Sequence, residues 1–193
     1  MKKVIILLLL VSSTISGQIS IAVTGGLNYT NTSSNLFEYE YSGLIKVNKF
    51  QTFGNFGFEL NYFRANLKIG TGLAYSNRGT REYNAYVKNY THVYRSDYIE
   101  LPIQLSYSYC KRKFDSGIGF GLHYKLNTGI MLDDYNRLFG LDFRLSSSWN
   151  LNRHLAIVPS YTFGNLDKYV SNTKNVYLHH VFALNLRYTF KHL

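Results

Sequence analysis

Strict alternation between bulky apolar residues and small or polar residues is the feature that most constrains this chain. Near the C-terminal end the bulky positions are Phe182, Leu184, Leu186, Tyr188 and Phe190, and the positions between them are Ala183, Asn185, Arg187 and Thr189. Because successive side chains of a β-strand point to opposite faces, this order gives one apolar and one polar face. The pattern recurs in eight segments, which predicts an all-β fold of eight antiparallel strands. The expected strands are residues 19–29, 51–62, 66–78, 95–109, 113–126, 138–150, 154–163 and 177–190.

The first residues have the form of a secretion signal. A pair of lysines precedes the apolar run from Val4 to Val11, and small residues ending at Gly17 follow. A basic start, a short apolar stretch and a small-residue exit are typical of a signal peptide. The run is too short to cross a bilayer as a helix, which takes about 20 residues. We therefore expect residues 1–17 to be a signal peptide and residues 18–193 to form one domain.

The composition differs from that of an ordinary secreted domain. Charged residues make up 17% of the chain and aromatic residues another 17%, with 18 Tyr and 13 Phe, whereas a soluble domain has about 25% charged residues. Tyrosine suits a surface that is apolar at one end and wet at the other, as at a membrane boundary. The net charge of +10 is scattered along a secreted chain, which argues against a nucleic-acid partner.

The lengths of the connections alternate. Short turns are expected near 63–65, 110–113 and 151–153, and the long connections are expected at 30–50, 79–94, 127–137 and 164–176. Short turns on one side and long loops on the other are typical of outer-membrane barrels, with both termini on the periplasmic side. The sequence therefore predicts an up-and-down transmembrane β-barrel in the outer membrane of a Gram-negative bacterium.

The two strand faces decide which side meets lipid. The lumen of an eight-stranded barrel is only just wide enough to be filled by side chains, so the many large apolar residues cannot all lie inside it. The opposite face carries mainly glycine and serine, with a few large polar residues. We therefore expect the apolar face to point outward, toward lipid.

Charged residues on the small-residue face predict a polar network inside the barrel. The residues are Glu59, Lys68, Arg78, Glu100, Asp115, His123, Lys125, Asp142, Arg144 and Arg187. Charges away from water need partners. Symmetric pairing about the 110–113 turn sets Glu100 opposite His123. Glu59 and Lys68 fall on neighbouring strands, with Arg187 at a similar height one strand away. The favoured interpretation is a structural plug of ion pairs; a narrow or gated pore lining and a ligand site are the alternatives.

The long loops hold the candidate contact residues. Phe37, Tyr39 and Tyr41 lie in the first loop, and Arg81 and Lys88 lie in the second. Loops on a rigid scaffold are where binding usually resides. Cations at the outer rim could bind the phosphates of lipopolysaccharide, but ordinary solvated loop charge is the favoured explanation.

Other chemistry is weakly supported. Cys110 is the only cysteine, so it forms no internal disulfide and belongs to no metal motif; no cofactor is expected. His179 and His180 near the outer rim could suggest a lipid-modifying enzyme, but such chemistry needs a neighbouring serine nucleophile and a carboxylate. No outward-facing serine is apparent beside them, so we expect no catalysis.

One strand carries a family resemblance. The segment from Tyr98 to Tyr107, with the sequence YIELPIQLSY, resembles a strand of the PorT-like outer-membrane β-barrel proteins of the Bacteroidota. Residues 25–28 and 184–190 are similar to the opening and closing strands of that family. The resemblance implies an integral outer-membrane barrel, related in architecture to OmpA and OmpX, without established chemistry. The family's namesake is associated with secretion and gliding machinery, a role that we do not transfer.

Together these observations predict a monomeric barrel in the outer-membrane lipid. It would have a structural role, or bind an extracellular or envelope partner through its loops. A small channel is the alternative.

Overall fold

The computed structural model describes residues 17–34, 46–84, 89–127, 139–171 and 173–192. These residues form nine strands: β1 (Gln18–Ser34), β2 (Lys46–Lys49), β3 (Gln51–Arg64), β4 (Leu67–Asn84), β5 (Asn89–Tyr109), β6 (Phe114–Asn127), β7 (Phe139–Asn150), β8 (Leu155–Ser171) and β9 (Thr173–His192). No helix in the described ranges is long and apolar enough to cross a membrane.

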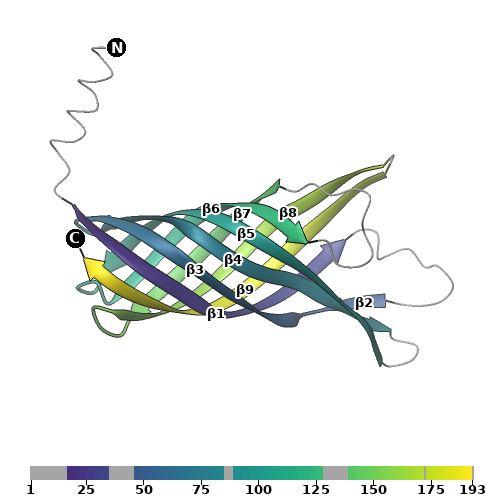
Figure 1. Ribbon diagram of the computed structural model, residues 1–193, viewed down its shortest axis with the longest axis horizontal. Helices are drawn as coiled ribbons and strands as arrows, with labels where there is room; N and C mark the ends of the chain where they lie inside the picture. The colour runs from purple at the N-terminus through teal and green to yellow at the C-terminus, as the bar shows by residue number, and fades with distance from the viewer. Residues whose placement is uncertain (1–16, 35–45, 85–88, 128–138, 172, 193) are drawn as a thin grey trace, which may run out of the picture.

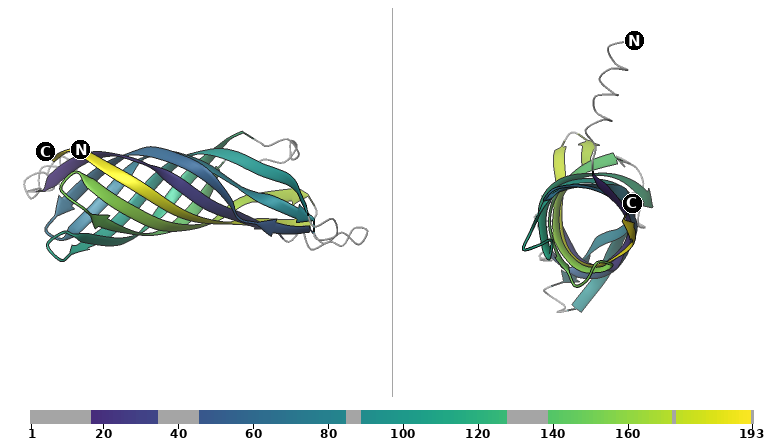
Figure 2. Two further views of the ribbon diagram at one scale, coloured as in Figure 1. Left: turned by 90° about the horizontal axis from the view of Figure 1, so that it is seen from below. Right: turned by 90° about the vertical axis from the view of Figure 1, so that its left-hand side faces the viewer.

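Eight of the strands close into a barrel. The hydrogen-bonded order is β2-β4-β3-β1-β9-β8-β7-β6-β5, and a further pairing between β4 and β5 completes the ring. The short strand β2 lies beside the far end of β4, where Lys46 pairs with Asn84. The view along the axis shows the closed ring, and the side view shows the strong tilt of the strands (Figure 2). The predicted eight-stranded antiparallel barrel is confirmed.

The interior of the barrel is polar and its outer surface is apolar. Among the described residues only Ala22, Tyr98, Ala156 and Val181 are buried apolar residues, against twenty buried polar or charged ones. Large aliphatic side chains such as Leu186, at 57% exposure, lie outside. Soluble monomers rarely expose apolar surface on this scale, whereas an outward apolar band is what a membrane barrel requires. The predicted orientation of the two faces is confirmed.

Two of the predicted long loops are largely strand instead. The β4–β5 ladder continues from Gly79 opposite Arg95 to Asn84 opposite Asn89, and the β8–β9 ladder continues to Ser171 opposite Thr173. The sequence interpretation ended these strands where apolar alternation stopped. Backbone pairing alone can extend a hairpin into water, because it needs no apolar face.

The extended hairpins and the chain ends mark opposite ends of the barrel. Figure 1 shows the β4–β5 and β8–β9 hairpins projecting at one end, and both described chain termini at the other. We call these the hairpin end and the turn end. The turn end also carries the short connections 65–66, 110–113 and 151–154, as the sequence predicted.

Candidate functional site

Four charged side chains cross the lumen toward the hairpin end. In this upper cluster, Arg78 Nη2 donates to Glu100 Oε1 and to Asp142 Oδ2, each at 2.6 Å. Arg144 Nη2 donates to Glu100 Oε2 at 2.6 Å. Arg78 and Glu100 lie on the neighbouring strands β4 and β5, whereas the Arg78–Asp142 and Arg144–Glu100 pairs link β4 and β5 to β7, which is not their neighbour in the sheet. Arg78, Glu100 and Asp142 are almost fully buried.

Aromatic rings pack against the upper cluster. The Arg78 guanidinium lies 5.2 Å from the Tyr98 ring centroid, and the rings of Tyr98 and His123 meet edge to face at 5.3 Å. His123 Nδ1 lies 3.3 Å from Asp142 Oδ2. A cation over a buried ring gains electrostatic stabilisation beyond packing. The rings therefore fill the space around the ion pairs.

Two glycines make room for this packing. A Cβ atom on Gly140 would overlap His123 Nε2, and a Cβ atom on Gly164 would overlap Asp142 Oδ1. The large polar side chains of the cluster occupy the volume that these positions leave empty. A larger residue at either position would have to displace His123 or Asp142.

A second group of charges crosses the lumen toward the turn end. In this lower cluster, Lys68 Nζ lies 3.1 Å from Asp115 Oδ2. Arg187 reaches the same carboxylate at 3.5 Å and Glu59 at 3.8 Å. The hydroxyls of Ser108 and Ser148 donate to Asp115 at 2.7 and 2.8 Å. The lower cluster is thus centred on one carboxylate that receives bonds from several strands.

Above the upper cluster, β1 bonds directly to β4. The β3–β4 ladder begins only at Asn55 opposite Ser76. Beyond it, the Thr30 hydroxyl donates to the Gly79 carbonyl at 2.6 Å and accepts from the Gly79 amide at 3.0 Å. Thr30 is fully buried. Its side chain therefore replaces ladder hydrogen bonds at a gap in the sheet.

Charged side chains do pair across the lumen, but the partners of Glu100 and Lys68 differ from those expected from the register alone. Glu100 pairs with His123 in backbone register as expected, yet its carboxylate bonds to Arg78 and Arg144. Lys68 bonds to Asp115, and Glu59 lies near Arg187. Charge pairing across the lumen overrides adjacency along the sheet, because the narrow interior brings distant strands within reach.

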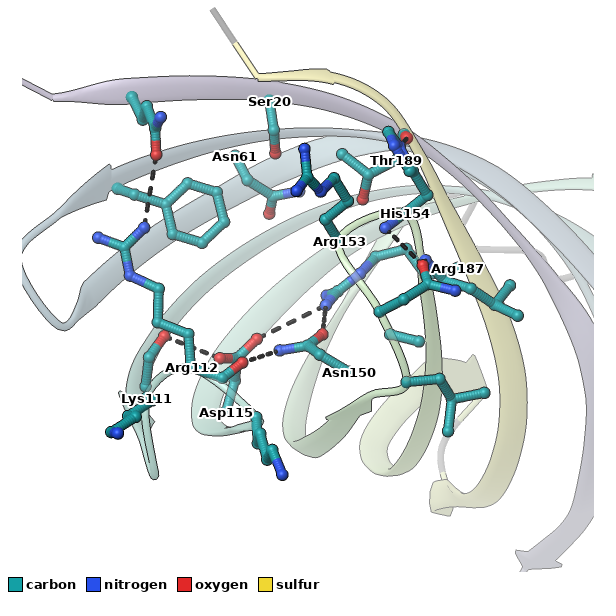
Figure 3. A pocket seen from close by; sticks show the side chains of 18 residues that line it. Ser20, Asn61, Lys111, Arg112, Asp115, Asn150, Arg153, His154, Arg187 and Thr189 are labelled. Carbon is teal, nitrogen blue, oxygen red and sulfur yellow. Dashed lines mark hydrogen bonds and ion pairs between the residues drawn. The ribbon is translucent and has the colours of Figure 1, made fainter.

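Cavities lie on either side of the lower cluster. A small cavity of about 50 Å³ is lined by Arg78, Glu100 and Arg144 among others. Arg78 Nε and Nη1 are buried and lack a hydrogen-bond partner among the described atoms. A polar space of this size can hold at least one water molecule, and water in it would satisfy such donors. A larger cavity of about 590 Å³ opens at the turn end (Figure 3).

The candidate contact residues fall mostly beyond the part of the chain that the structure describes. Phe37, Tyr39, Tyr41 and Lys88 lie outside the described residues. Arg81 belongs to β4 and pairs with Val93 of β5.

The two histidines considered for catalysis, His179 and His180, have different surroundings. The Tyr161 hydroxyl lies 2.7 Å from His180 Nδ1, and His179 is buried in the lumen. No group of His, Cys, Asp and Glu residues in the described ranges could hold a metal ion. Cys110 is free and exposed at the turn end.

A closed barrel with a polar, ion-paired lumen and an apolar outer band defines a transmembrane β-barrel of the bacterial outer-membrane type. Residues 12–190 match the model of a family described as "Outer membrane protein beta-barrel domain", and the chain belongs to this family.

Solved structures of outer-membrane proteins are similar to the chain at low sequence identity. Neisserial surface protein A is 15% identical with a TM-score of 0.55, over 88% of this chain and 97% of that chain. OprG from Pseudomonas aeruginosa is 16% identical with a TM-score of 0.48, over 89% of this chain and 95% of that chain. No curated protein matches the chain in sequence. These likenesses concern the fold alone.

Proposed function

We propose that this protein is a sealed, non-enzymatic scaffold of the outer membrane, with its turn end in the periplasm, which binds an extracellular or envelope partner through its hairpin end. The observation that carries the proposal is the Arg78–Asp142 ion pair across the lumen, at 2.6 Å. The lower cluster places a second set of ion pairs across the lumen. Paired charges that fill a narrow lumen favour a scaffold over the alternative, a small channel.

The hairpin end supports a binding role. The β4–β5 and β8–β9 ladders continue beyond the apolar band, and Figure 1 shows them as projecting hairpins. Backbone pairing pre-organises these two hairpins, which lowers the entropy cost of binding at this end of the barrel. Arg81, in β4, and Lys88, in the connection between β4 and β5, are the proposed contacts with lipopolysaccharide phosphates. The proposed aromatic contacts are Phe37, Tyr39 and Tyr41, in the connection between β1 and β2.

The finer resemblance to the PorT-like proteins rests on the Tyr98–Tyr107 strand. Two of its inward residues have clear roles in this barrel: Tyr98 packs beside Arg78, and Glu100 bonds to both arginines of the upper cluster. These contacts explain why the strand carries Tyr98 and Glu100. That the chain belongs to the PorT-like proteins is part of the proposal.

The test combines conductance with attachment. The folded protein in planar bilayers is expected to give no steady ion steps. Cells of a Gram-negative host that express it are expected to attach to surfaces coated with extracellular-matrix glycoproteins, and the variant F37S/Y39S/Y41S is expected to attach no better than cells without the gene. Surface expression of both forms is the control. Steady conductance without attachment would overturn the proposal in favour of a channel.

A further inference from the structure

We infer that the cavity at the turn end binds an acidic peptide segment of a periplasmic protein. The cavity has a volume of about 590 Å³, within the usual range for ligand pockets. It opens on the barrel axis, inside the ring of turns, and its wall includes the inward-facing residues Ser20, Asn61 and Thr189 (Figure 3). A lipid headgroup lies around the outside of a barrel, so the position favours a ligand that approaches through water.

The charge of the cavity is strongly one-sided. Its wall carries Lys111, Arg112, Lys113, Arg153 and Arg187 but only one carboxylate, Asp115. That carboxylate is already engaged by Lys68, Ser108 and Ser148, so it cannot neutralise the cations at the rim. A concave site lined by one sign of charge attracts ligands of the opposite sign.

Two arginines flank the mouth from different turns. Arg112, in the β5–β6 turn, donates to the Ala65 carbonyl at 3.1 Å and to Gln18 Oε1 at 3.4 Å. Figure 3 shows Arg153, from the β7–β8 turn, pointing across the mouth toward Asn61. Guanidinium groups suit carboxylates because their planar donors can bond both oxygens.

The turn that carries Arg112 holds its cations in an unfavourable backbone conformation. The Lys113 amide donates to the Cys110 carbonyl at 3.1 Å, and three consecutive residues, Cys110, Lys111 and Arg112, have φ values of 51°, 56° and 63°. Positive φ values favour glycine and asparagine, and each left-handed residue with a larger side chain costs about 1–2 kcal/mol. Asn150 Nδ2 braces it by donating to the Arg112 carbonyl at 2.7 Å. Backbone strain that is braced in this way is typical of functional positions.

The wall also has apolar members, which favours a peptide over a bare inorganic anion. Phe63, Leu151 and Leu155 line the cavity, and Leu151 is 46% exposed. A peptide with alternating acidic and aliphatic residues can contact both the cations and these side chains. A phosphate ion can contact only the cations.

Fluorescence anisotropy of a labelled peptide of alternating Glu and Leu tests the site, with the folded barrel in zwitterionic detergent micelles. We expect R112Q/R153Q to weaken binding by on the order of tenfold for each lost charge-assisted bond. The matched control is R95Q, which removes one charge at the hairpin end, where Arg95 is exposed beside Asp97. R95Q should bind as the unchanged protein does. The mobility shift on heating in SDS checks that each variant is folded.

A second measurement needs no substitution. The same peptide with a maleimide at one end should label Cys110, in the flanking turn, faster than a peptide in which Gln replaces Glu. Equal affinity or equal labelling for the Gln peptide would overturn the proposal, as would equal losses for R95Q and R112Q/R153Q. Displacement of the peptide by equimolar inorganic phosphate would overturn the proposal in favour of a small-anion site. Loss of peptide binding when the barrel is placed in phosphatidylglycerol nanodiscs would overturn it in favour of a lipid site. The micelle measurement does not depend on the hairpin end or on orientation, so its failure leaves the proposed function standing.

Discussion

Arg78 and Asp142 lie 64 residues apart on β4 and β7, and their side chains meet across the lumen at 2.6 Å. Both side chains are 1% exposed. Strands β5 and β6 separate them in the sheet, so this contact is made through the interior of the barrel. The contact links distant strands and fills the space between them. Apolar packing has the same role in the core of a soluble protein.

Removing one partner of this pair should destabilise the barrel strongly. D142A leaves the buried Arg78 guanidinium with one carboxylate fewer, and breaking a buried ion pair costs about 3–5 kcal/mol. Urea unfolding in lipid vesicles measures the free energy. The control is R95A, which removes an exposed pair with an N–O distance of 3.2 Å and should cost at most about 1 kcal/mol. Similar losses for the two variants would show that the lumen is hydrated well enough to screen the charges.

The close approach of Gly164 to the Asp142 carboxylate gives a second prediction. G164A places a methyl group on Asp142 Oδ1, so we expect it to cost about 1–3 kcal/mol through overpacking. G54A is the matched control, because a Cβ atom there has no heavy atom within 4 Å. Both variants can be compared in the same urea titration. A G164A barrel as stable as G54A would mean that the Asp142 carboxylate moves away without loss.

The strand interiors could be predicted from sequence because their signal is local. Alternation fixes which face of a strand is apolar, and the narrow lumen then fixes which face points outward; Leu186 and Arg187 lie as that reasoning requires. The hairpin extensions could not be predicted in this way. Residues 79–84 and 89–94 pair along their backbones without apolar alternation to mark them.

The partners within the lumen depend on geometry that no short segment contains. Symmetry about a turn gave the register of Glu100 and His123, but the choice of Arg78 and Arg144 as partners of Glu100 depends on how far the strands are staggered around the closed barrel. The strained turn is similar, because the residues Cys110, Lys111 and Arg112 include no glycine or asparagine to signal positive φ values. Its functional residues could have been suspected only from the run of cations between Cys110 and Phe114.

The outer surface gives a third prediction. L186R introduces a charge at a lipid-facing position of β9 that is 57% exposed, and near the membrane midplane this costs about 2–4 kcal/mol. L151R places the same charge in the turn between β7 and β8, where the cost near the interface is about 0–1 kcal/mol. Refolding titrations into lipid vesicles measure both. Equal costs would contradict the position of the membrane band.

The single cysteine can establish which end of the barrel faces the periplasm. Cys110 is free and exposed in the β5–β6 turn, at the end that also holds both described chain termini (Figure 1). If that end is periplasmic, a maleimide too large and too charged to cross the outer membrane should leave Cys110 unlabelled in intact cells. It should label Cys110 fully once the outer membrane is permeabilised. The control is the double variant C110S/S171C, which moves the cysteine to the tip of the β8–β9 hairpin, where Ser171 pairs with Thr173, and it should label in intact cells. Labelling of Cys110 in intact cells at the rate of the control would invert the orientation and place the cationic cavity at the cell surface.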